Sequence, residues 1–115
     1  MKNKQIKRGD IFIVDLEPAK GSEIQKERPC LVVSPDEINS GTKYVTILPI
    51  TSGNHRYMFR IPCSIKNTKG VEKECNIVVD QIRTVTKERM KKHIAELDIK
   101  TLTKVLETLQ EMFAV

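Results

Sequence analysis

The feature that most constrains the fold is a series of short apolar segments within residues 1 to about 83. Each segment is rich in Ile, Val and Leu and is bounded by turn-forming residues, a pattern typical of β-strands. The segments are DIFIVD (Asp10–Asp15), PCLVVS (Pro29–Ser34), KYVTILPI (Lys43–Ile50), YMFRIPC (Tyr57–Cys63) and NIVVDQI (Asn76–Ile82). Because no helical pattern separates most of them, they predict a mainly β fold with an antiparallel barrel rather than a parallel sheet.

The periodicity changes in the C-terminal third of the chain. After Asp98, apolar residues recur every three or four positions, which predicts an amphipathic helix that begins at an aspartate cap and packs on the barrel. These apolar residues are Ile99, Leu102, Val105, Leu106, Leu109, Met112 and Phe113. Just upstream, Thr86 is expected to cap a short helical turn that runs through Met90.

The length of 115 residues predicts a single domain spanning 1–115. No apolar run approaches the ~18–20 residues of a membrane-spanning helix, and the basic N-terminus lacks the apolar stretch of a secretory signal. We therefore expect a cytoplasmic protein without a membrane partner.

Lys and Arg total 20 against 15 Asp and Glu, giving a net charge of +5. This excess favours a polyanionic partner, nucleic acid first, although many soluble proteins carry a similar charge without binding one. Aromatic residues make up only 4% and Trp is absent. A stacking platform for single-stranded RNA is therefore poorly supplied.

The cysteines and histidines give no sign of a metal site. Cys30, Cys63 and Cys75 lack the spacing of a zinc site or of a disulfide framework, and Cys30 and Cys63 fall in apolar stretches, as small buried residues do. His55 and His93 are far apart and have no ligand-like companions. We expect no metal, no cofactor and a reducing compartment.

Two polar connections hold the candidate chemistry. The longer, Leu16–Glu27, carries Glu23 and is followed by Arg28, immediately before the strand that Pro29 opens. Thr51 and Ser52 follow the third predicted strand. A carboxylate, a guanidinium and hydroxyls at one rim suit metal-free RNA cleavage, with Glu23 as base and Arg28 at the phosphate. The competing interpretation is a surface ion pair between Glu23 and Arg28.

The run RGDIFIVDLEPAKGSEIQKERPCLVVSPDEIN resembles the opening half of a MazF/PemK-type toxin. The segments PITSG, FRIPC and DQIRTV follow in the family's order, and LETLQEMF resembles the closing helix of one branch. The resemblance extends from Arg8 to Phe113. It implies an SH3-like, CcdB-type barrel with added helices that forms a homodimer.

The resemblance also implies an endoribonuclease that cuts single-stranded mRNA without metal at short motifs, leaving a 2′,3′-cyclic phosphate and a 5′-hydroxyl. The implied partner is a cognate antitoxin whose tail folds onto the toxin. The toxin–antitoxin complex is expected to bind promoter DNA chiefly through the antitoxin.

By the same resemblance, Arg28 and Thr51 match the family's most often assigned catalytic residues, and Glu23 matches its loop glutamate. The positions expected to contact RNA are Ser22, Lys26, Ser52, His55, Arg56, Asp80 and Gln81. For Asp80 and Gln81 a purely structural role is an equal alternative, and His55 and Arg56 fit exposed positions as well. Many members carry a glycine before the arginine, and some a histidine where this chain has Ser22, so the identity of the general base stays open.

Two other classes of function compete with the nuclease. One is a protein-binding toxin like CcdB, which poisons gyrase and has no nuclease site. The other is an RNA- or DNA-binding module without catalysis, which the charge alone would allow. The combination of Arg28 and Thr51 in their sequence settings favours the nuclease.

Overall fold

The computed structural model describes residues 5–16, 27–52, 59–66 and 69–115. The strands are β1 (Asp10–Asp15), β2 (Glu27–Val32), β3 (Tyr44–Ser52), β4 (Arg60–Lys66), β5 (Glu72–Val78), β6 (Arg83–Thr86) and β7 (Met90–Glu96). The helices are α1 (Asp36–Gly41) and α2 (Ile99–Met112), with 3-10 turns η1 (Val79–Gln81) and η2 (Lys87–Arg89).

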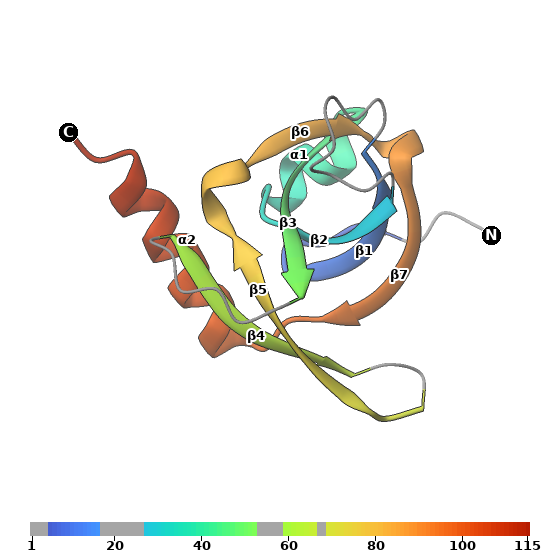
Figure 1. Cartoon of the computed structure of the whole chain (residues 1–115). Helices are drawn as coiled ribbons and strands as arrows, with labels where there is room; N and C mark the ends of the chain where they lie inside the picture. Colours follow the sequence, from blue (N-terminus) through green and yellow to red (C-terminus); the bar gives the residue numbers. More distant parts are fainter. Residues whose placement is uncertain (1–4, 17–26, 53–58, 67–68) are drawn as a thin grey trace.

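The strands form one curled antiparallel sheet in the order β4-β5-β3-β2-β1-β7, with β6 paired to β3 outside this path. Figure 1 shows the sheet curving around as a half-barrel, with α2 along one side. The nine-residue β3 pairs with β6 over Tyr44–Ile47, with β2 over residues 47–49 and with β5 over Ile50–Ser52. The predicted mainly β, antiparallel fold with a C-terminal helix is confirmed.

Apolar residues fill both faces of the central strands. In β1, Ile11 packs in a cluster with Leu31, Leu48 and α2, whereas Phe12 packs in a second cluster on the other face. This double burial explains why the segments read as continuous apolar runs instead of alternating ones. Each fully buried Ile or Leu contributes about 1.5–3 kcal/mol to the free energy of unfolding. Cys30 is fully buried in the second cluster, as expected.

Helix α2 is capped by Asp98, as predicted. The Asp98 Oδ2 atom accepts hydrogen bonds from the backbone N–H and the hydroxyl of Thr101, each at 2.9 Å. The apolar stripe packs through Leu102 and Val105, while its two ends, Ile99 and Phe113, are exposed. No helix in the described segments has the length and apolar character needed to cross a membrane.

The contact between α2 and the sheet needs a glycine at position 9. Gly9 has a φ of +96°, and a Cβ there would lie 3.2 Å from Leu102 Cδ2. Its backbone also bridges two elements, because its N–H donates to Val32 O and its carbonyl accepts from Leu97 N, both at 2.9 Å. A side chain at this position would strain the backbone at positive φ and crowd the Leu102 side chain of α2.

Several expected boundaries shift. The predicted strand over Tyr57–Cys63 is described from Arg60 and runs on to Lys66, and the segment over Asn76–Ile82 begins as a strand at Glu72 and ends in the turn η1. There the buried Val79 donates its N–H to Phe59 O at 3.0 Å, which extends the register of β4 and β5 by one residue before the turn. The turn expected at Thr86–Met90 is the 3-10 turn η2, without a side-chain hydrogen bond from Thr86. Helix α1 and strands β6 and β7 are not predicted from the sequence.

Candidate active site

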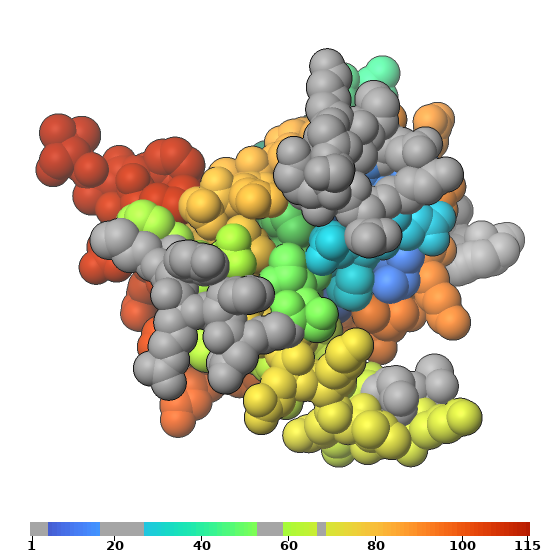
Figure 2. Space-filling model, in the orientation of Figure 1, coloured from blue at the N-terminus to red at the C-terminus, as the bar shows by residue number. Residues whose placement is uncertain are grey.

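A cavity of about 760 Å³ lies where the ends of β2 and β3 meet β4, β5 and β7. In Figure 2 the exposed part of β3 (green) lies between β2 (cyan) and β5 (yellow). Strand β2 contributes Glu27 and Arg28 to the lining, and β3 contributes Thr51 and Ser52. Glu27 and Arg28 precede Thr51 and Ser52 by more than twenty positions in the sequence, but the two pairs of residues form one wall of the cavity.

Arg28 and Thr51 meet because of the register between β2 and β3. Cys30 pairs with Pro49, and continuing this antiparallel register by two residues places Arg28 opposite Thr51. The Arg28 Nη1 atom donates a hydrogen bond to the carbonyl of Ile50 at 3.3 Å, which holds the guanidinium against β3. The structure places these two residues on the same rim of the cavity.

Both residues keep a buried polar atom unpaired. Within the described residues, Arg28 Nε and Thr51 Oγ1 are buried without a hydrogen-bond partner. Leaving such an atom unpaired costs about 1–3 kcal/mol, so natural folds retain few of them. Because both residues line the cavity, a rotation of either side chain would bring its unpaired donor to an acceptor oxygen of a ligand such as a phosphodiester.

Ser52 lines the cavity and is exposed, and it lies opposite Cys75 of β5. Asp80 and Gln81 are also exposed, but they belong to the turn η1 and do not line the cavity. The structure therefore brings Ser52, and not Asp80 or Gln81, together with Arg28 and Thr51.

The remaining predicted site residues lie outside the described residues. They are Ser22, Glu23 and Lys26 in the first polar connection and His55 and Arg56 in the second. Their roles stay predictions.

Among the described residues, the charged lining of the cavity is mainly cationic. Arg28, Lys66, Lys73 and Lys92 provide four positive groups against the two carboxylates of Glu27 and Glu72. Apolar side chains, such as Ile65, Val71 and Ile94, line the space between them. Cations attract phosphates and apolar surface accepts base faces, so this wall suits a nucleic-acid strand.

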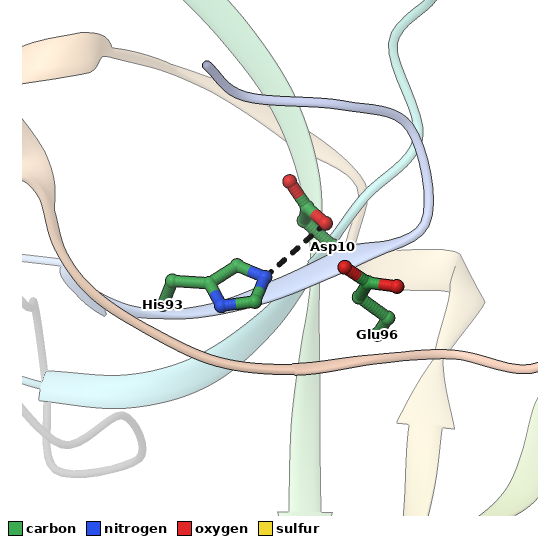
Figure 3. A group of neighbouring side chains, drawn as sticks. All are labelled: Asp10, His93 and Glu96. Carbon is green, nitrogen blue, oxygen red and sulfur yellow. Dashed lines mark hydrogen bonds and ion pairs between the residues drawn. The ribbon is translucent and has the colours of Figure 1, made fainter. Parts of the chain in front are cut away.

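His93 of β7 also lines the cavity, and the expectation that it lacks companions is wrong. Its Nε2 atom lies 3.2 Å from Oδ1 of Asp10, as Figure 3 shows. Its ring also packs edge-on against Phe12, with centroids 5.2 Å apart. His93 and Asp10 are 83 residues apart in the sequence. They meet only because β7 pairs with β1, and no local sequence signal reveals that pairing.

One group of described side chains has metal-compatible donors. Asp10, His93 and Glu96 each offer one ligand atom, and these atoms lie within 4.8 Å of one another. Nitrogen and carboxylate oxygens suit zinc-like ions. However, one oxygen of the buried Asp10 carboxylate accepts from Lys7 N at 2.9 Å and the other contacts His93. Hydrogen bonding therefore accounts for the arrangement, which braces the imidazole.

Comparison with known proteins identifies the family. Residues 7–113 match the profile described as PemK-like, MazF-like toxin of type II toxin-antitoxin system. Endoribonuclease MazF9 of Mycobacterium tuberculosis is 34% identical over 111 residues, covering 91% of this chain and 93% of the relative. Endoribonuclease EndoA of Bacillus subtilis is 34% identical over 106 residues, covering 91% of each chain. This chain belongs to the PemK/MazF family of toxins.

Solved structures show the same fold. MazF from Deinococcus radiodurans superposes with a TM-score of 0.79 at 24% identity, covering 98% of this chain and all of that one. A mycobacterial endoribonuclease in complex with its cognate antitoxin superposes with a TM-score of 0.72 at 18% identity, covering 95% and 93%. The half-barrel with its C-terminal helix is thus the fold of the family.

Proposed function

We propose that this toxin is an endoribonuclease that cleaves single-stranded mRNA without a metal ion. The observation that carries the proposal is the pair of unpaired buried atoms, Arg28 Nε and Thr51 Oγ1, on a cavity whose charged lining is mainly cationic. Relatives aligned over about nine-tenths of the chain and named endoribonucleases support it.

The proposed reaction uses the ribose of the RNA as its own nucleophile. A base removes the proton of the 2′-hydroxyl, the 2′-oxygen attacks the adjacent phosphorus, and the bond from phosphorus to the 5′-oxygen breaks. The departing 5′-oxygen takes up a proton, so the products carry a 2′,3′-cyclic phosphate and a 5′-hydroxyl. Proton transfer of this kind typically contributes about 10²–10⁴-fold to the rate.

Arg28 supplies the charge that a metal would otherwise provide. Negative charge develops on the non-bridging phosphate oxygens as the 2′-oxygen attacks, and a positioned guanidinium stabilises it through paired N–H donors. The Thr51 hydroxyl, on the adjoining strand, orients the same phosphate. Glu23 remains the proposed base, at a position outside the described residues.

The proposed partners follow from the same assignment. We expect a cognate antitoxin to cover this cavity, because an acidic segment that folds on binding complements a cationic wall. We also expect a homodimer, and promoter binding only by the toxin–antitoxin complex.

The decisive experiment is cleavage of a long single-stranded RNA in EDTA, with the chemistry of the new ends identified. Wild-type protein should cut at discrete sites and leave cyclic-phosphate ends, and Arg28→Ala should lose at least 10²-fold in rate. Lys104→Ala, an exposed charge change on α2, is the matched control and should cut like wild type. Activity that requires an added divalent ion would contradict the metal-free mechanism. Absence of cutting by the folded, antitoxin-free wild type would favour a protein target, as in the CcdB-like alternative.

A further inference from the structure

Two of the three cysteines lie opposite each other on neighbouring strands. In the antiparallel pair β4–β5, Cys63 is the direct partner of Cys75, and their Sγ atoms are 3.1 Å apart. Their sequence spacing gave no reason to pair them, whereas the register of the two strands does. Figure 1 shows β4 and β5 as one long, twisted hairpin that extends past the rest of the sheet.

The backbone geometry of this position suits a disulfide. Directly opposed residues in an antiparallel pair have Cα atoms about 4.5–5.5 Å apart. A disulfide spans Cα separations of about 4.4–6.8 Å, so the backbone spacing of this pair permits a bond between Cys63 and Cys75.

The surroundings of the two sulfurs make them chemically unequal. The two thiols share a hydrogen bond in which either sulfur can donate; with Cys63 as the donor, this bond and the positive charge of Lys73 lower the pKa of Cys75 against the opposing effect of burial. The same hydrogen bond, together with burial, raises the pKa of Cys63. Cys75 is therefore the better nucleophile. Cys63 lies close enough to react with a sulfenic acid formed on Cys75.

Accessibility separates this pair from the third cysteine. Cys75 is buried, with 7% of its surface exposed, but it contributes to the cavity lining, and Cys63 is half-buried, so a small oxidant that enters the cavity has a route to this pair. Cys30 is fully buried, and burial raises the pKa of its thiol to about 12. Cys30 thus serves as an internal reference that stays reduced.

We propose that Cys63 and Cys75 form a reversible dithiol–disulfide pair that hydroperoxides oxidise within a single chain. The Cys75 thiolate attacks one oxygen of hydrogen peroxide, the O–O bond breaks, and the hydroxide released takes up a proton to become water. The Cys63 sulfur then attacks the Cys75 sulfenic acid, the S–O bond breaks, and a second water leaves with the Cys63 proton. Two thiols lose two electrons in total, and one peroxide becomes two waters.

The bond would form in the wall of the candidate site. Cys75 lies opposite Ser52 of β3, and the next residue of β5, Asn76, pairs with Thr51. The proposal concerns the thiols alone and does not depend on the proposed ribonuclease activity.

The test treats the purified full-length chain with a small excess of hydrogen peroxide and follows intact mass and free thiols. Wild type should lose about 2 Da, retain one of its three thiols, and recover all three with dithiothreitol. Peptide mapping should place the link between Cys63 and Cys75. Cys30→Ser, the matched control, should form the same link and retain no thiol. Cys63→Ser should instead gain about 16 Da, as a sulfenic acid at Cys75 that has no resolving partner.

Three outcomes would overturn the proposal. One is loss of thiols without a Cys63–Cys75 link in the peptide map. Another is the appearance of disulfide-linked dimers on a non-reducing gel as the main product. The last is consumption of Cys30 ahead of the other two cysteines, which would show that access and ionisation have been assigned to the wrong sulfurs.

Discussion

The Nε2 atom of His93 lies 3.2 Å from Oδ1 of Asp10, which joins a residue of the cavity wall on β7 to a carboxylate on β1 that is only 3% exposed. The other oxygen of Asp10 accepts the backbone N–H of Lys7 at 2.9 Å. A single buried carboxylate therefore fixes both the start of β1 and the orientation of the imidazole.

We predict that Asp10→Ala lowers the free energy of unfolding by about 1–3 kcal/mol, because it leaves the Lys7 N–H and the imidazole without their acceptor. Urea denaturation measures the change. Glu96→Ala, in the same group of side chains but exposed, should stay within about 0.5 kcal/mol of wild type. Equal effects of the two substitutions would show that Asp10 does not brace this wall.

Thr51→Val should separate activity from stability. Valine keeps the shape of threonine and removes a buried hydroxyl that has no partner among the described residues, so the free energy of unfolding should be unchanged or higher. RNA cleavage should fall by at least tenfold if the hydroxyl orients the phosphate. Denaturation and cleavage assays on the same preparation check both expectations, and a stable variant with full activity would remove Thr51 from the site.

RNA binding should depend on salt through the lysines of the cavity wall. Lys66→Gln and Lys92→Gln should each weaken binding to 2′-O-methyl RNA, which lacks the attacking hydroxyl. Each should also reduce the slope of log affinity against log salt by about 0.7, the value for one phosphate contact in a single strand. Lys104→Gln on α2, the control, should change neither the affinity nor the slope. If Lys104→Gln weakened binding as much as Lys66→Gln or Lys92→Gln, the RNA would not bind in this cavity.

The rate of peroxide oxidation should rise with pH as Cys75 ionises, since the thiolate is the nucleophile. Because the hydrogen bond with Cys63 lowers the pKa of Cys75, the midpoint should lie below that of a free cysteine measured in the same way. Stopped-flow measurement of thiol loss gives this profile. Cys63→Ala, which removes the donor, and Lys73→Gln should each move the midpoint upward, and a midpoint unaffected by both changes would contradict the assigned causes.

The cap of α2 should contribute to stability in a pH-dependent way. Hydrogen bonds from the backbone and side chain of Thr101 lower the pKa of Asp98. A carboxyl with a lowered pKa stabilises the fold above its unfolded-state pKa, and this contribution is lost as pH falls through its folded-state pKa. Asp98→Ala should therefore lower the thermal midpoint at pH 7, with a smaller difference from wild type in acid. A constant difference across this range would point to a cause other than the charged cap.

The parts of the fold that the sequence predicts are those in which local pattern and burial agree. Strands β1, β2 and β3 are apolar on both faces, and α2 shows a three-to-four period after an aspartate cap. Strand β7, with the sequence MKKHIAE, is half-exposed at the edge of the sheet and carries charged residues, so its composition does not distinguish it from a loop. Edge strands are defined by the partner they pair with rather than by their own residues.

The candidate site also has a part that the sequence predicts and a part that it does not. The sequence predicts Arg28 and Thr51 as site residues because each adjoins a recognisable strand in a sequence setting that resembles the family. His93 and the Cys63–Cys75 pair were missed because they depend on the registers of β7 with β1 and of β4 with β5. Register is set by the hydrophobic pattern of both strands and by the turns between them, so it cannot be read from one strand alone.

Strand β3 hydrogen-bonds in turn to β6, β2 and β5, and Thr51 lies near its end. Opening this strand would break three ladders at once, so its amides should exchange with deuterium only as slowly as the whole domain unfolds. Thr51 is thus held in place before any substrate arrives. Little conformational entropy then remains for the toxin to lose at this residue on binding RNA.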